Sequence, residues 1–202
     1  MKNFIISSFL ILLSLTVKSQ CFQIESILVD ACDGGNEGQN EMVTFKVGNA
    51  NLSAPTLTVN WPANTWRGLT QNATTASQLA SINASITGCG FLREPVAGVL
   101  KANSRVLLIT GTNWNPTAQS FVNLNDTLTV LFQTYNLGNT GGHFANYTVT
   151  PTPSNRTLTM TFTTVPGCTD SVTYNRNNLI KQNQAIPAGV NSTAPPSCAP
   201  IA

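Results

Sequence analysis

Short runs of alternating apolar residues, many of them β-branched, constrain this chain more than any other feature of its sequence. Gly, Asn and Pro separate the runs and favour turns. Alternation with a period of two places one side chain on a core and the next in water, as in a half-buried strand. Seven such runs with turn-rich connections predict an all-β protein built as an antiparallel β-sandwich. The clearest runs are Phe22–Val29, Met42–Val47, Thr56–Trp61, Arg105–Thr110, Thr127–Phe132, Thr157–Thr163 and Ser171–Tyr174.

The same alternation predicts which side chains form the core, because one face of each strand should be buried. Only residues 75–82 have a helical pattern, which predicts one short helix in a connection. We expect the sandwich to span residues 20–185, and the Pro- and Ser-rich residues 186–202 to have no regular structure. The side chains predicted to be buried are Leu28, Phe45, Val106, Leu108, Val130, Phe132, Met160 and Phe162.

Residues 1–19 have the features of a secretory signal peptide. A lysine near the start is followed by Phe4–Val17, which is apolar but short for a membrane span. The cleavage rule for small residues then places the start of the mature chain at Gln20. Cys21 invites a lipoprotein interpretation, but Lys18 and Gln20 stand where a lipid-attachment motif has aliphatic and small residues. The sequence therefore predicts an exported chain with an unmodified cysteine.

The charge of the mature chain excludes an electrostatic site for nucleic acid. The whole chain has 10 Lys and Arg residues against 8 Asp and Glu. The two lysines of the leader leave with it, so the mature chain carries equal numbers of both signs, whereas a nucleic-acid-binding domain needs a basic excess. No second segment is apolar over the length of a membrane span, and we expect none in the mature chain.

Several longer stretches follow one another in an order that resembles the lamin-tail-like domain of secreted Bacteroidetes surface proteins. The resemblance covers nearly the whole mature chain and implies an Ig-like sandwich. The stretches are Cys21–Cys32, Glu41–Asn49, Gly98–Ile109, Phe121–Phe132, Gly141–Tyr147 and Asp170–Tyr174.

The resemblance implies a cellular context for the chain but no catalytic mechanism. Members of the family stand ahead of other modules and of a C-terminal sorting domain that is associated with type IX secretion and gliding motility. This sequence stops at Ala202 without such a sorting domain. The family has no assigned catalytic residues, so the resemblance implies no catalytic site here.

Five cysteines in an oxidising compartment predict disulfides and one unpaired thiol. Domain termini often lie close together, which favours a bridge between Cys21 and Cys198. Cys32 and Cys89 would then pair across neighbouring loops and leave Cys168 as the free thiol. Spacing alone leaves other pairings open, because five cysteines can form two bridges in fifteen ways.

An acidic cluster suggests one metal site. Asp30, Asp33, Glu37 and Glu41 surround glycines, and oxygen donors on a flexible loop suit Ca²⁺. The spacing does not match an EF-hand, so a solvated acidic loop, with Glu41 facing water at a strand start, is the stronger interpretation. A zinc site is not expected, because the chain has no C-x-x-C pair and a single histidine.

Two further groups of residues have both a structural and a functional interpretation. His143 could act as a general base only beside a nucleophile and an orienting carboxylate, and a structural role is favoured. Trp61, Trp66 and Trp114 could form a stacking platform for sugar rings, although packing in the core is the commoner use of such side chains. Residues 93–95 are interpreted as a surface turn.

Two Asp-Ser/Thr-apolar tripeptides match the acceptor pattern of Bacteroidetes O-glycosylation, with Thr127 and Ser171 as the acceptors. Taken together, these features predict a non-catalytic module that binds a cell-surface protein or glycan. The alternative is a carbohydrate-binding module that uses the three tryptophans, and it requires them to be exposed on one patch. A hydrolase would instead require a pocket that joins His143 to an acidic residue and a nucleophile.

Overall fold

The computed structural model describes residues 20–29, 37–115, 120–135, 142–145 and 154–179. The predicted signal peptide and the predicted C-terminal tail lie outside these residues. Most of the described elements are strands, and only two short α-helices occur among them, which confirms an all-β sandwich. The two helices are α1 (Glu37–Asn40) and α2 (Ala73–Asn83).

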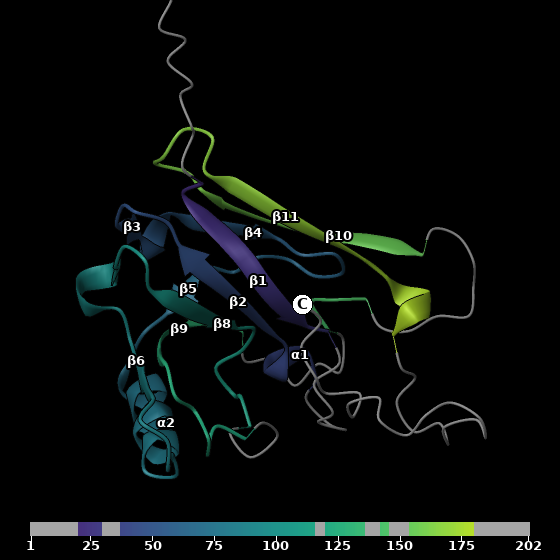
Figure 1. Ribbon diagram of the computed structural model, residues 1–202. Helices are drawn as coiled ribbons and strands as arrows, with labels where there is room; N and C mark the ends of the chain where they lie inside the picture. The colour runs from purple at the N-terminus through teal and green to yellow at the C-terminus, as the bar shows by residue number, and fades with distance from the viewer. Residues whose placement is uncertain (1–19, 30–36, 116–119, 136–141, 146–153, 180–202) are drawn as a thin grey trace, which may run out of the picture.

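The larger of the two main sheets has six strands in the order β1-β2-β8-β9-β5, with β6 beside β9 (Figure 1). It is not wholly antiparallel, because β8 and β6 both run parallel to β9. This differs from the predicted antiparallel sandwich. The strands are β1 (Phe22–Leu28), β2 (Met42–Val47), β5 (Leu69–Thr70), β6 (Phe91–Arg93), β8 (Arg105–Ile109) and β9 (Thr127–Gln133).

A second, antiparallel sheet faces the first. Its order is β11-β10-β4, so β4 and β11 are its edge strands. Its strands are β4 (Leu57–Asn60), β10 (Asn155–Phe162) and β11 (Thr169–Asn175). A small pair, β3 (Leu52–Ser53) and β7 (Val99–Leu100), lies at one end, and short 3-10 turns span Ala54–Thr56, Val96–Gly98 and Arg176–Asn178.

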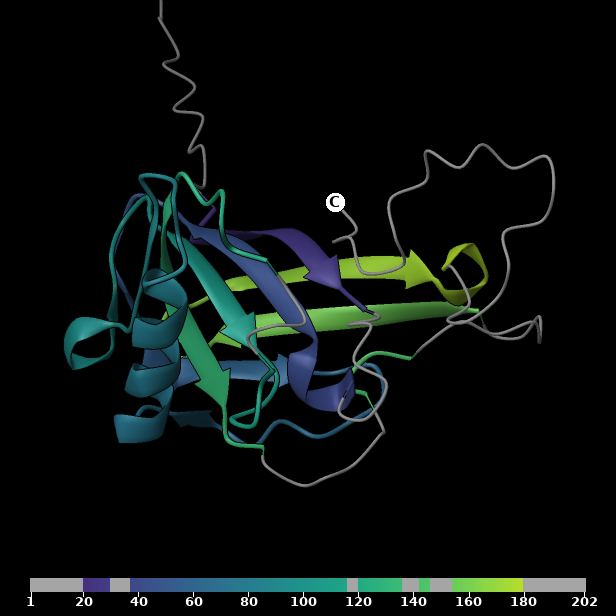
Figure 2. The same ribbon diagram turned by 90° about the horizontal axis from the view of Figure 1, so that it is seen from below.

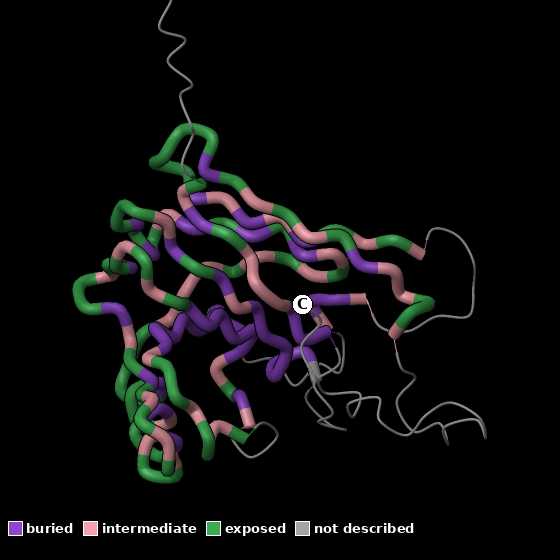
Figure 3. The backbone as a smooth tube through the Cα atoms, viewed as in Figure 1, coloured by how far each residue is buried: buried purple, intermediate pink, exposed green. Residues whose placement is uncertain are grey.

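The main core fills the space between the two sheets. Phe22, Phe45 and Phe162 meet there at ring-centroid distances of 5.2–6.1 Å. All eight side chains that the alternation predicts to be buried are buried. The inward positions appear as alternating buried segments along β10 in Figure 3.

A second core lies on the other face of the large sheet, where α2 packs (Figures 1 and 2). Leu107 and Ile109 of β8 and Val130 and Phe132 of β9 contribute to it. The central strands are therefore covered on both faces, as expected where strands pair in parallel.

The helix α2 includes the predicted residues 75–82 and begins two residues earlier. Asn72 caps its N-terminus by accepting hydrogen bonds from the backbone N–H groups of Thr74 and Thr75. The hydroxyl of Thr75 in turn accepts from the N–H of Asn72, which completes a reciprocal capping box. Leu79 and Ile82 on the buried face hold the helix against the large sheet.

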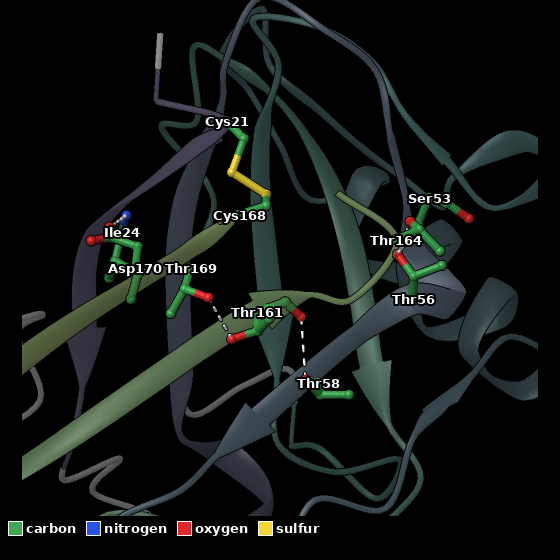
Figure 4. Close-up of a disulfide and its surroundings, with 10 residues drawn as sticks. All are labelled: Cys21, Ile24, Ser53, Thr56, Thr58, Thr161, Thr164, Cys168, Thr169 and Asp170. Carbon is green, nitrogen blue, oxygen red and sulfur yellow. Dashed lines mark hydrogen bonds between the residues drawn. A yellow bond between two sulfur atoms is a disulfide. The ribbon is translucent and has the colours of Figure 1, made fainter. Parts of the chain in front are cut away.

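The disulfide joins Cys21 to Cys168, with Cα atoms 5.6 Å apart (Figure 4). The predicted Cys21–Cys198 bridge is therefore wrong, and so is the prediction that Cys168 is the free thiol. The bridge forms because the first residues of β1 and β11 lie side by side where the two sheets meet. Next to it, the N–H of Ile24 donates to the Asp170 carboxylate over 2.7 Å.

Cys89 is free and exposed, so the predicted Cys32–Cys89 bridge is also wrong. Cys32 and Cys198 lie outside the described residues. A bridge between strands of two sheets is typical of proteins that fold in an oxidising compartment. Neither described helix has the length and hydropathy needed to cross a bilayer.

Candidate functional site

The three tryptophans do not form a common platform. Trp61 and Trp114 are only 4% and 2% exposed. Trp61 packs edge-on against His143 and Phe144, and Trp114 lies in the core beneath α2. The favoured interpretation, packing in the core, is confirmed for Trp61 and Trp114. The alternative that required all three indoles to be exposed on one patch is therefore wrong. Trp66 alone is partly exposed.

A buried polar network holds Trp61 in place. Its indole N–H donates to Oε1 of Gln133 over 2.7 Å. The amide nitrogen of Gln133 donates to the carbonyl of Thr110 over 3.2 Å and also contacts Nε2 of His143. All of these side chains are buried, so the Gln133 amide uses its oxygen and both of its hydrogens inside the protein.

Glu41 lies at the centre of this network and is fully buried. Its Oε2 accepts the N–H of His143 over 2.6 Å, and its Oε1 accepts the N–H of Phe144 over 3.2 Å. Its backbone carbonyl accepts both the N–H and the hydroxyl of Thr110. The carboxylate thus satisfies the backbone of a segment that is about a hundred residues away in the sequence.

The segment that Glu41 holds, residues 142–145, is also held from the second sheet. The Tyr174 hydroxyl donates to the carbonyl of Ala145 over 3.0 Å and accepts its N–H over 2.8 Å. Burial raises the pKa of Tyr174 to about 12, so the hydroxyl keeps its proton. The glycine-rich stretch around His143 therefore closes one end of the sandwich.

The geometry assigns His143 a structural role. Because the Gln133 amide donates to Nε2, the neutral ring carries its proton on Nδ1, which faces Oε2 of Glu41 at 3.4 Å. Burial lowers the pKa of His143 to about 4; a hydrogen bond with the Gly38 backbone opposes this, and the charge of Arg67 adds to it. The ring is fully buried and both of its nitrogens face internal groups.

The lowered pKa of His143 predicts that stability depends on pH. Between about pH 6.5 and 4 the unfolded chain binds a proton at this histidine and the folded chain does not. The free energy of unfolding should fall by up to about 3 kcal/mol as the pH drops through this range. Urea unfolding at several pH values measures it. His143→Gln should lose this part of the slope, and equal slopes in both proteins would contradict the prediction.

The candidate calcium residues have different positions. Asp30 and Asp33 lie outside the described residues, and nothing is described of the Glu37 side chain. Glu41 neither faces water nor stands on an open loop, so its interpretation as part of a solvated acidic loop is wrong. Over the ranges that the structure describes, no three His, Cys, Asp or Glu side chains gather as a metal site would require.

The two candidate glycosylation residues have similar local geometry. Thr127 and Ser171 each donate their backbone N–H to the side chain of the preceding aspartate, over 2.7 and 2.9 Å. Thr127 is half-buried at the start of β9, whereas Ser171 is exposed on β11. Both remain predictions, with Ser171 the more accessible hydroxyl.

A cavity of about 410 Å³ opens between the edge strands β4 and β5. This is the side of the sandwich opposite the disulfide, which closes the sheets along β1 and β11. Apolar walls come from Pro55, Leu57 and Leu69, and Trp66 lines the cavity as well. Polar groups come from Thr58, Thr70, Gln71 and Glu94.

The floor of the cavity is the edge of β9. On that edge β6 pairs with residues 127–129 and β5 with residues 132–133. Val130 and Leu131 lie between and line the cavity, and no strand in the described part of the chain pairs with them there. Successive residues direct their backbone groups to alternate edges, so one of the two presents its N–H and C=O to the cavity.

The carboxylate of Glu94 is held in position at the cavity. Its Oε1 accepts the hydroxyl of Thr75, in the first turn of α2. Glu94 is partly buried, and the residue before it, Arg93, ends β6. The interpretation of residues 93–95 as a simple surface turn is therefore wrong. Nothing in the local sequence indicates this role of Glu94, because only the packing of α2 brings Thr75 beside it.

Comparison with known proteins gives no relative from which a function could be transferred. No protein-family model, curated protein or solved structure matches this chain.

Proposed function

We propose that this chain is a non-catalytic, exported binding module that holds its ligand in the cavity between β4 and β5. The cavity carries the proposal. Its volume of about 410 Å³ lies within the usual range of small-molecule sites, about 300–1,000 Å³. It combines apolar walls with a few fixed polar groups, which is the composition such sites have.

Several features support export to the cell surface or the medium. Residues 1–19 have the pattern of a signal peptide, and the disulfide suits an oxidising compartment. The order of strand motifs, which resembles that of lamin-tail-like domains, supports an Ig-like module of a surface protein. A cell-surface protein or glycan is then the expected partner.

The buried position of His143, away from the cavity, supports a binding function rather than hydrolysis. The one histidine of the chain is fully buried, and its nitrogens face Gln133 and Glu41. It lies on the network that closes the sandwich, not among the residues that line the cavity. A general base would have to reach a substrate.

Binding to intact bacterial cells tests the proposal. We expect fluorescently labelled chain 20–202 to bind cells saturably in flow cytometry and to leave their surface polymers uncut. Trp66→Ala should lower binding at least tenfold, because this side chain lines the cavity. Thr173→Ala, which changes an exposed hydroxyl on β11, is the matched control and should bind normally. Equal binding by both variants would exclude the cavity as the binding site, and no binding by the wild type would contradict a partner on these cells.

A further inference from the structure

The groups around the cavity identify the chemical class of its ligand. Glu94 is the only charged residue among those lining it. Its Oε1 is occupied by Thr75, and no hydrogen bond within the described residues occupies Oε2. A ligand must therefore bring hydrogen-bond donors to this carboxylate and carry no negative charge of its own.

We propose that the cavity binds a neutral saccharide. This proposal rests on the proposed function of the chain as a binding module. The C–H-rich face of a pyranose ring suits the negative face of the Trp66 indole, because an aromatic ring attracts partial positive charge there. Adjacent hydroxyls of a sugar can donate to Oε2 of Glu94 in charge-assisted bonds.

The remaining polar groups fit the same ligand. The amide nitrogen of Gln71 donates one hydrogen to the carbonyl of Pro95 over 3.4 Å, which leaves its second hydrogen and its oxygen for a ligand. The hydroxyl of Thr70 shares a hydrogen bond with the hydroxyl of Thr134, and its oxygen can accept a further one. The floor offers the backbone N–H and C=O of Val130 or Leu131, which need a partner when water leaves. A sugar hydroxyl satisfies either group, because it can donate and accept.

An extended peptide fits the cavity less well. A peptide that adds as a strand needs a continuous edge with free backbone donors and acceptors. The strand β5 is only two residues long, and Pro55 and Pro95, which have no N–H, line the cavity. The edge that β9 offers is limited to two residues between β5 and β6.

Titration calorimetry and tryptophan fluorescence test the proposal on chain 20–202. The probes are neutral oligosaccharides of glucose, mannose, galactose and xylose, an oligogalacturonate, and a short basic peptide. We expect at least one neutral oligosaccharide to bind and to change the fluorescence of Trp66. Oligogalacturonate should bind at least tenfold more weakly, because its carboxylates repel Glu94.

Variants locate the site. Trp66→Ala and Glu94→Gln should each weaken saccharide binding at least tenfold, and Thr173→Ala should leave it unchanged. Glu94→Gln keeps an oxygen for the Thr75 hydroxyl, so the helix cap survives, and unchanged thermal unfolding checks this. Equal weakening in all three variants, or unchanged binding in Glu94→Gln, would overturn the assignment.

The outcomes separate the two proposals. If no neutral saccharide binds while the basic peptide does, and Trp66→Ala abolishes that binding, the saccharide assignment is wrong and the binding module stands. If none of the probes binds and the labelled chain also fails to bind cells, the proposed function is wrong as well.

Discussion

Replacing Cys21 and Cys168 together by serine should lower the free energy of unfolding by about 5 kcal/mol. The bridge joins residues that are 147 positions apart. Cross-linking so long a loop removes much conformational entropy from the unfolded chain, and the loop-closure model gives about 5 kcal/mol for this length. Urea unfolding of the wild type and the double variant, both without reductant, measures the difference.

Cys89→Ser is the matched control for this experiment. Cys89 is free and exposed, so its replacement should change stability by less than about 0.5 kcal/mol. The bridge assignment would be contradicted if Cys21→Ser alone and Cys89→Ser alone had equal effects. It would also be contradicted if peptide mapping under non-reducing conditions found Cys21 joined to another cysteine.

Glu41→Ala should destabilise the protein by roughly 2–6 kcal/mol, because it leaves two buried backbone donors without an acceptor. The substitution removes the acceptor of the backbone N–H groups of His143 and Phe144, and it leaves a cavity as well. Each buried donor without a partner costs about 1–3 kcal/mol. Thermal or urea unfolding at neutral pH measures the loss.

Two other substitutions sharpen the interpretation. Glu41→Gln keeps one carbonyl oxygen and should lose less stability than Glu41→Ala. Glu25→Ala removes a partly exposed carboxylate that pairs with Arg105 at 2.8 Å, and such surface pairs contribute about 0–1 kcal/mol. If Glu41→Ala cost no more than Glu25→Ala, the buried carboxylate would not hold the segment around His143.

Local alternation was enough to predict one buried face of the main strands, but not that β8 and β9 are buried on both faces. Phe45, Leu108 and Phe162 lie on inward faces because a strand alternates its side chains whatever its partner is. The pairing of the strands was not predictable in the same way. The run in β8 pairs in parallel with β9, and its outer face belongs to an apolar cluster to which α2 contributes Leu79 and Ile82. Both facts depend on segments far away in the chain.

For the functional residues too, the local sequence predicts some features, and others depend on contacts between distant segments. An acidic residue beside glycines suggests a loop, and nothing near Glu41 in the sequence indicates that its carboxylate accepts N–H groups of residues 143 and 144. The lack of a catalytic motif around His143 favours a structural role, and the buried ring in contact with Gln133 agrees with it. The role of Glu94 depends on Thr75, which is brought to it by the packing of α2.

The sequence by itself determined the fold class, one buried face of each main strand and the short helix, because each follows from neighbours within a few residues. The tertiary structure decided the disulfide partner of Cys21, the burial of Glu41, Trp61 and Trp114, and the existence of the cavity between β4 and β5. These depend on which strands lie at the edges of the sheets and how the sheets close on each other, and such contacts join residues about a hundred positions apart.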